Sequence, residues 1–330
     1  MRILITGGSG FVGRHVVREL NLLGHELIIP KRQELDLLSP ITAVLHGLNE
    51  EVRVLDSVRS IAFFFMQNNV DAIVHLAGVV GGIGFNKDNQ GKLGYDNLQM
   101  GLNILEASRL ANVKKLIMVG TTCSYPYIPR TIPFIEEELF DGMPEMTNSG
   151  YGVAKRTLVK LGVEYAKQYG LKVVNLIPTN MIGEYDHFDD EKSHVVPALI
   201  KKFEHPFEDS TGIYGISPNR SFPHKYVQLW GTGAASRDFL YAGDCARAIA
   251  IALEKDVGPE PINLGMGKEI TIRDLAETIK RVGGYDSEIV WDLSKPDGQP
   301  RRSLNVSRAR NVLKWQATTS LEESILKAIN

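Results

Sequence analysis

Three glycines near the start of the chain, Gly7, Gly10 and Gly13, follow one another at three-residue intervals. Residues 2–6 before them form an apolar run typical of a buried strand, and residues 11–22 after them have helical periodicity. Glycine permits a tight turn and close backbone approach to a pyrophosphate, which the N–H groups that begin a helix attract. The pattern predicts a dinucleotide site formed by these glycines with Phe11 and Val12; the alternative is a tight turn without a ligand.

The same alternation of apolar strand and amphipathic helix continues along the chain. Such continuous apolar strands indicate a parallel sheet that helices cover on both faces. We therefore expect an α/β fold with a Rossmann-like, doubly wound parallel sheet. Strands are expected at 26–30, 72–76, 115–119 and 172–177, and helices at 151–168, 244–254 and 271–282, the last with Thr271 as N-cap.

The regular alternation ends after about Met181, where turn-forming residues become frequent. We expect residues 1–180 to form the nucleotide-binding domain, with part of the chain returning to it near 228–250. Residues 181–330 are expected to form mainly a smaller α/β domain that binds the substrate.

Charge and cysteine content exclude several classes of protein. The chain has 37 Lys and Arg against 39 Asp and Glu, whereas a nucleic-acid binder carries a basic excess. Its 2 cysteines, Cys123 and Cys245, cannot form a disulfide framework or a Cys-rich zinc site.

The start of the chain lacks the apolar region of a signal peptide, and the apolar run at 61–66 is too short to span a bilayer. We expect a cytoplasmic protein with no metal, nucleic-acid or membrane partner.

Basic residues at the end of the second expected strand bear on the choice of cofactor. An acidic residue there would bind the ribose 2′-hydroxyl of NAD, whereas Lys31 and Arg32 suit the 2′-phosphate of NADP. NADP is therefore favoured and NAD remains possible, since both cations can also be ordinary surface charges. Asp56 is a candidate for the adenine edge, and Asp36 competes with it.

Tyr151 and Lys155 form a Tyr-x-x-x-Lys pattern at the start of an expected helix. Residues four apart lie above one another on one helix face. A nearby ammonium favours the phenolate, so this tyrosine could exchange a proton with a substrate near neutral pH. Accidental spacing on a helix surface is the alternative when the pair is considered alone.

Further motifs stand where strands are expected to end: His75-Leu76-Ala77-Gly78, Thr121 and Asn180. With the glycine turn and the Tyr151/Lys155 pair, they resemble the extended short-chain dehydrogenase/reductase family that acts on nucleotide sugars. The resemblance implies that Tyr151 donates a proton, that Lys155 orients it and binds the nicotinamide ribose, and that Thr121 occupies the Ser/Thr position. It also implies that Leu76 and Ala77 contact the cofactor.

A narrower resemblance, to the GDP-L-fucose synthase family, rests on motifs at 80–83, 123–126, 178–180, 193–199, 229–233 and 295–301. It implies an NADPH-dependent 3,5-epimerase and 4-reductase of GDP-4-keto-6-deoxy-D-mannose, with Cys123 as base and His194 as acid. The residues that it implies for the sugar nucleotide are Asn180, Lys202, Trp230, Arg237 and Lys295.

The chemistry of a 4-keto sugar suits these groups. Its C3–H and C5–H bonds are acidic, and a thiol and an imidazole titrate close enough to neutral pH to serve as base and acid. Tyr151 and Thr121 can donate hydrogen bonds to the enolate oxygen. Considered alone, Cys123 would be a small buried apolar residue and His194 a structural histidine.

Four departures from the fucose synthase pattern keep alternatives open. Ser9 stands where that family has a basic residue, Glu184 replaces a proline, and residues 37–53 and 205–224 are longer than usual. The alternatives are a different base, another sugar such as a heptose, or only one of the two activities. A related NDP-sugar epimerase and a non-enzymatic cofactor sensor are the other possibilities.

Apolar faces on helices that begin near Asn97 and Tyr151 further suggest a homodimer.

Overall fold

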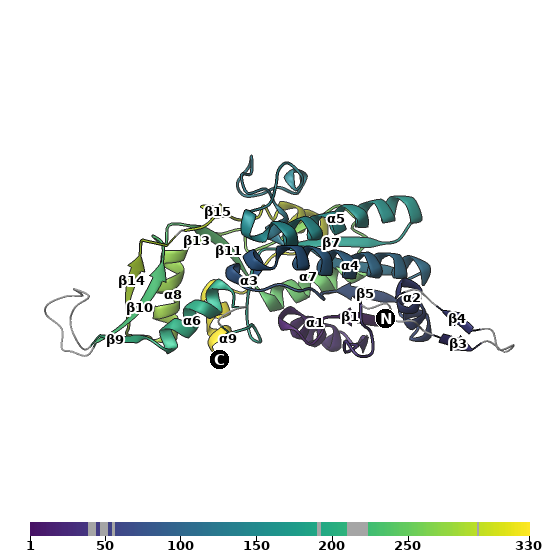
Figure 1. The fold of residues 1–330 in the computed structure, drawn as a ribbon, viewed down its shortest axis with the longest axis horizontal. Coiled ribbons are helices and arrows are strands. Elements are labelled where there is room, and N and C mark those ends of the chain that lie inside the picture. Colours follow the sequence, from purple (N-terminus) through teal and green to yellow (C-terminus); the bar gives the residue numbers. More distant parts are fainter. Residues whose placement is uncertain (39–43, 47–51, 55–56, 190–192, 210–223, 296) are drawn as a thin grey trace.

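The computed structural model describes residues 1–330 except 39–43, 47–51, 55–56, 190–192, 210–223 and 296 (Figure 1). Its centre is a six-stranded sheet in the order β12-β7-β6-β5-β1-β2, and all neighbouring strands pair in parallel. The predicted Rossmann-like parallel sheet is confirmed. The strands are β1 (Arg2–Thr6), β2 (Glu26–Ile28), β5 (Ala72–His75), β6 (Lys115–Val119), β7 (Val173–Pro178) and β12 (Ile262–Leu264).

Helices cover both faces of this sheet because successive strand residues point to opposite sides. On β1, Ile3 and Ile5 enter a core cluster with residues of α1 and α7, whereas Leu4 enters a second cluster with residues of α2, α4 and α5. Figure 1 shows these helices on either side of the strands. Their bounds are α1 (Phe11–Leu22), α2 (Ser57–Gln67), α4 (Gln90–Leu110), α5 (Ser149–Tyr169) and α7 (Ala242–Glu254).

The sixth strand comes from late in the chain. β12 pairs with β7 through Ile262–Leu264, and the buried face of α7 packs into the same core as β1. The chain thus returns to the nucleotide-binding sheet with both α7 and β12. A boundary at residue 180 includes the first five strands of the sheet. It assigns the sixth strand, β12, to the segment expected to bind the substrate.

A smaller region with its own core follows β7. It contains one sheet in the order β14-β10-β9 and another in the order β13-β11-β15, with β8 paired to β11. Thr271 caps α8 as predicted, since its hydroxyl accepts the N–H of Asp274 at 3.0 Å. The elements are β8 (Asn180–Ile182), α6 (Val195–Glu204), β9 (Phe207–Asp209), β10 (His224–Trp230), β11 (Ser236–Tyr241), β13 (Glu269–Thr271), α8 (Ile272–Gly283), β14 (Glu288–Asp292), β15 (Arg301–Arg302) and α9 (Leu321–Ile329).

The two longer segments are only partly among the described residues. In the first of them, 37–53, the strand β3 (Val44–His46) pairs in antiparallel fashion with β4 (Val52–Val54), which ends one residue beyond it. At the ends of 205–224, β9 pairs with β10. The β3–β4 pair and the β9–β10 pair lie toward opposite ends of the long axis (Figure 1).

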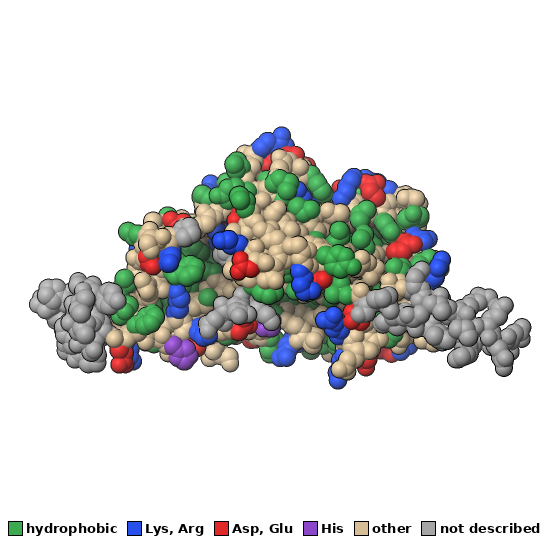
Figure 2. All heavy atoms as spheres, viewed as in Figure 1, with side chains coloured by type: hydrophobic (Ala, Val, Ile, Leu, Met, Phe, Trp, Pro, Cys, Tyr) green, Lys and Arg blue, Asp and Glu red, His purple; other side chains and the backbone are tan. Residues whose placement is uncertain are grey.

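Parallel order brings the ends of β1, β5, β6 and β7 to one edge of the sheet. Ligands of open α/β sheets bind at this carboxyl edge. The glycine turn follows β1, Leu76 and Ala77 follow β5, Thr121 and Cys123 follow β6, and Asn180 follows β7. On the face in Figure 2, basic and acidic side chains are interspersed.

Candidate active site

The glycine turn packs so closely that side chains would not fit. Gly7 has a φ of +71°, and a Cβ there would lie 2.8 Å from the backbone nitrogen of Ala77. A Cβ on Gly13 would lie 2.1 Å from the carbonyl oxygen of Gly7. Gly10 is the N-cap of α1 and provides no capping side chain, so the first turn, which contains Phe11 and Val12, presents backbone N–H groups. This geometry fits a bound pyrophosphate.

Thr6 and His75 join the ends of β1 and β5 beneath the turn. The Thr6 hydroxyl lies 2.8 Å from His75 Nδ1 and accepts the N–H of Ala77 at 3.2 Å, while Leu76 N–H donates to the Thr6 carbonyl at 3.1 Å. Burial, with a smaller contribution from Lys155, lowers the pKa of His75 to about 3, so this imidazole is neutral. The sequence motif included His75 without a role and did not include Thr6, although a polar side chain within an apolar strand was the available signal.

The basic residues that predict NADP lie after β2. The Lys31 backbone N–H donates to the Glu34 carboxylate at 2.7 Å, and Arg32 Nε lies 3.3 Å from Asp36 Oδ2. Asp36 is therefore paired with Arg32. Asp56, the other candidate for the adenine edge, lies outside the described residues.

Tyr151, Lys155 and Thr121 meet at the carboxyl edge. Lys155 is buried in α5 and donates to the Val119 carbonyl at 3.1 Å; burial lowers its pKa to about 8. Its Nζ lies 6.0 Å from the centre of the Tyr151 ring. Burial raises the pKa of the Tyr151 hydroxyl, against a hydrogen bond with Thr121 that lowers it. The proximity of Lys155 does not overcome desolvation, so the phenol is protonated and suited to donate.

Cys123 lies beside this group, in a short 3₁₀ turn (Thr122–Ser124) after β6. Its N–H donates to Thr121 Oγ1 at 3.2 Å. A Cβ on Gly152 would lie 2.3 Å from the Cys123 carbonyl oxygen, so α5 packs directly against the turn. Arg302 Nη1 donates to Cys123 Sγ at 3.6 Å. No sequence motif pointed to Arg302, because only the fold brings β15 to the end of β6.

His194 is the N-cap residue of α6. Its Nδ1 lies 3.3 Å from the carboxylate of the buried Asp186, and this interaction raises the pKa of His194. The imidazole remains 46% exposed. Among the hydrogen bonds and ion pairs of the described residues, none joins His194 to Cys123. The sequence left Asp186 unassigned, and its short separation from His194 along the chain was the only signal.

The residues expected to bind the sugar nucleotide fall into two groups. Trp230 is 65% exposed, and the Nζ atoms of Lys202 and Lys295 are 5.9 and 5.8 Å from its ring centre. Arg237 lies apart from them and donates to the carbonyls of Ser236 and Gln299 at 2.7 Å. Burial, reinforced by the charge of Arg302, lowers the pKa of Arg237 to about 10.

Asn180 is held at the junction of the two regions. Its Nδ2 donates to the Asp238 carbonyl at 3.0 Å, and β8 pairs with β11 at this point. Arg237, on the same strand, is near enough to Cys123 for the charge of that residue to affect its pKa.

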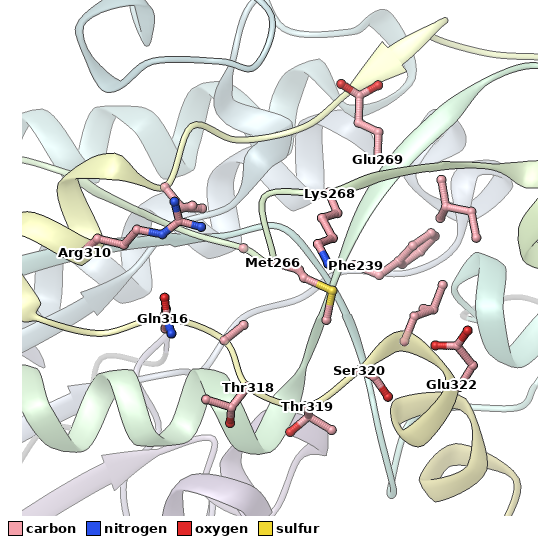
Figure 3. A pocket seen from close by; sticks show the side chains of 15 residues that line it. Phe239, Met266, Lys268, Glu269, Arg310, Gln316, Thr318, Thr319, Ser320 and Glu322 are labelled. Carbon is pink, nitrogen blue, oxygen red and sulfur yellow. The ribbon is translucent and has the colours of Figure 1, made fainter.

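A hollow of about 510 Å³ lies elsewhere, between β11, β13 and the segment that leads into α9 (Figure 3). Its walls contain none of the residues expected from the sequence. Its two acidic side chains are paired, Glu269 with Arg301 at 2.6 Å and Glu322 with Arg281 at 3.4 Å.

Across the described ranges, no three His, Cys, Asp or Glu residues are grouped to hold a metal ion, and no helix is long and apolar enough to cross a membrane.

The glycine turn and the edge of the parallel sheet agree with a family comparison. The model of the NAD dependent epimerase/dehydratase family matches residues 3–265. The chain belongs to this family. The match extends beyond residue 180 and includes β12, in agreement with the return of the chain to the nucleotide-binding sheet.

Individual relatives cover almost the whole chain. A GDP-L-fucose synthase of Sinorhizobium fredii is 36% identical over 99% of this chain and 94% of that protein. The structure of MlghC, a GDP-mannoheptose C4 reductase from Campylobacter jejuni with NADP bound, is 27% identical, has a TM-score of 0.80, and matches 99% of this chain and 96% of its own. A GDP-L-fucose synthetase from Naegleria fowleri bound to NADP is also 27% identical, with a TM-score of 0.80 over 99% of this chain and 91% of its own.

Proposed function

We propose that the chain is an NADPH-dependent 3,5-epimerase and 4-reductase of a GDP-4-keto-6-deoxy-hexose. The observation that carries the proposal is the meeting of Tyr151, Thr121 and Cys123 at the carboxyl edge of the sheet. Tyr151 and Thr121 can donate to the oxygen of one carbonyl group. The Cys123 thiol can exchange a proton with the carbon next to that carbonyl. The full-length similarity to a GDP-L-fucose synthase supports the same reaction.

Residues at the start of the sheet would hold the cofactor. NADPH, when bound, supplies the hydride for C4. The turn at Gly7, Gly10 and Gly13 has the close packing that a pyrophosphate requires. Lys31 and Arg32 would face the 2′-phosphate, and Lys155 the nicotinamide ribose. NAD remains the weaker candidate, and the NADP bound in two related structures supports this order.

The epimerisation would use groups on both faces of the sugar. Cys123 accepts the proton from C3 or C5, and the electron pair of that C–H bond moves toward the C4 oxygen. Tyr151 and Thr121 donate hydrogen bonds to this oxygen. His194 returns a proton to the other face, and Asp186, which raises the pKa of His194, favours the protonated form needed for that step.

In the reduction, Tyr151 gives its proton to the C4 oxygen as this oxygen gains charge. Burial keeps Tyr151 protonated until then. Lys155, fixed by the Val119 carbonyl, places a positive charge beside the phenol and stabilises the phenolate that remains.

At the nucleotide end, Trp230 offers an exposed aromatic surface close to Lys202 and Lys295. We propose that this group binds the base and phosphates, and that Arg237 and Asn180 bind the diphosphate nearer the sugar. Cations suit phosphates, and an aromatic ring suits a stacked base.

Reduction of a GDP-4-keto-heptose is the second candidate. It is favoured by the structural similarity to the GDP-mannoheptose C4 reductase. In the same region, β9 (Phe207–Asp209) pairs with β10, which carries Trp230.

The two candidates are separated by substrate. The protein is supplied with NADPH in D₂O and either GDP-4-keto-6-deoxy-mannose or a GDP-4-keto-heptose, and the product is analysed by NMR. We expect oxidation of NADPH with the hexose and deuterium at C3 and C5. A higher kcat/KM with the heptose would favour the second candidate, and turnover of neither would contradict both. A dTDP-linked 4-keto hexose tests the choice of base.

We further propose a cytoplasmic homodimer, with residues 1–180 binding the cofactor and 181–330 mainly the substrate. Much of α4 and α5 packs within one chain, where Met100, Ile104 and Leu158 are buried, but Tyr95 of α4 is 66% exposed. A dimeric mass in light scattering at micromolar concentration is expected. Cell fractionation tests the compartment.

A further inference from the structure

The thiol of Cys123 must carry negative charge to take a proton from carbon, and the structure provides a partner for that charge. Arg302 Nη1 donates to Cys123 Sγ at 3.6 Å, an ordinary distance for a hydrogen bond to sulfur. Hydrogen bonds from a guanidinium strengthen when the acceptor is ionised. A cation beside a cysteine also increases the reactivity of the sulfur.

The position of Arg302 is fixed by the fold. β15 pairs in parallel with β11, so that Arg302 is opposite Arg237 and Arg301 is opposite Ser236. Side chains alternate along a strand. Arg301 therefore forms a two-pronged contact with Glu269, at 2.6 and 2.9 Å, whereas Arg302 reaches Cys123. The Nε of Arg302 also donates to Gln299 Oε1 at 2.8 Å, which holds the guanidinium in place.

The charge of Arg302 is not neutralised by a neighbouring acid. Among the ion pairs of the described residues, none contains Arg302. The nearby Arg237 is cationic as well; burial and the charge of Arg302 lower its pKa, while the charges of Cys123, Glu145 and Glu269 raise it. Two guanidinium groups close together repel each other, and a negative sulfur beside them relieves that repulsion.

We propose that Arg302 is a positioning residue that holds the Cys123 sulfur in its negatively charged, proton-accepting state. This inference rests on the proposed function, which gives Cys123 the role of base. The proton moves from the sugar carbon to sulfur, the C–H electron pair passes to the C4 oxygen, and His194 donates the replacement proton. Arg302 itself exchanges no proton.

Alkylation of the free enzyme tests this without any substrate. Iodoacetamide modifies ionised thiols, and mass spectrometry follows Cys123, with Cys123→Ser as the blank. Arg302→Gln should slow alkylation at pH 7 by about tenfold, and Arg302→Lys should restore most of the rate. Arg301→Gln is the matched control, because its side chain contacts Glu269 and not Cys123.

An unchanged rate in Arg302→Gln, or an equal loss in Arg301→Gln, would overturn the proposal. Turnover gives a second readout. Arg302→Gln should lower kcat for deuterium exchange at C3 and C5 and leave KM unchanged; a rise in KM alone would assign Arg302 to the diphosphate and overturn it. Absence of exchange in the wild-type enzyme would contradict the proposed function, whereas alkylation would still test the Arg302–Cys123 contact.

Discussion

The two halves of the candidate site differ in how they are held. The cofactor half, made of the glycine turn, Thr121, Tyr151 and Lys155, packs on the edge of the sheet, and both Tyr151 and Lys155 are buried. The other half, here called the nucleotide half because it is proposed to bind the sugar nucleotide, lies on the smaller sheets and on α6. Its residues Trp230 and His194 are substantially exposed. Substitutions in the first half should therefore affect chemistry and folding together, while those in the second should affect mainly binding and pH dependence.

Tyr151→Phe should have the largest effect. It removes the proton donor and leaves the buried ring, so 4-reduction should fall by about 10²–10⁴-fold. Exchange at C3 and C5 should fall less, because Thr121 still donates to the enolate oxygen. NADPH oxidation and deuterium incorporation measure the two steps. Equal losses in both would assign Tyr151 to the enolate rather than to the reduction.

Gly13→Ala tests the packing of the cofactor half. The added Cβ would lie 2.1 Å from the Gly7 carbonyl oxygen, so the turn must open. We expect the Kd for NADPH to rise by about 100-fold or more, with a loss of about 2 kcal/mol in the free energy of unfolding.

Gly84→Ala in α3 (Ile83–Asp88) is the control, since its Cβ would meet nothing within 4 Å. Calorimetry and fluorescence titration compare the two variants. Wild-type affinity in Gly13→Ala would show that the turn tolerates the opening.

Asp186→Asn tests the pH dependence of the nucleotide half. The Asp186 carboxylate raises the pKa of His194, and without it burial would lower that pKa. Because His194 donates as the protonated form, activity falls as pH rises through its pKa. The alkaline limb of the kcat profile should therefore move to lower pH in the variant. A profile that does not move would exclude His194 as the acid.

The same pair has a consequence for stability. A histidine whose pKa is raised on folding stabilises the protein below its unfolded pKa, about 6.5, and this stabilisation is lost as pH rises through the folded value. The Tm difference between wild type and Asp186→Asn should thus be larger at pH 6 than at pH 9. An equal difference at both pH values would place the role of Asp186 elsewhere.

The contrast between the halves also explains what could be predicted from sequence. Residues 2–6, 11–22 and 115–119 form elements with the expected bounds, because apolar periodicity and glycine report local geometry. The sequence could not indicate that β12 returns to the sheet, since three residues carry little pattern. Arg302 is likewise 179 residues from Cys123, so only tertiary structure brings them together.

Trp230→Ala should have a smaller effect, confined to binding. The ring is 65% exposed, so the free energy of unfolding should change by less than about 0.5 kcal/mol. Loss of a stacking surface beside Lys202 and Lys295 should raise KM for the GDP-sugar by about tenfold with little change in kcat. Isothermal titration with GDP checks this directly. A large loss of stability would place Trp230 with the core instead.

Arg32→Gln should have the smallest effect, and it tests the choice of cofactor. Arg32 is 75% exposed and already paired with Asp36, so solvent and that carboxylate both weaken its attraction for a 2′-phosphate. We expect the Kd for NADPH to rise only about fivefold, with the Kd for NADH unchanged, because NADH lacks the phosphate. Lys31→Gln is the companion variant, and the double variant should lose most of the preference. If NADH and NADPH weakened equally, these cations would contribute general charge, and the preference for NADP would come from elsewhere in the cofactor half.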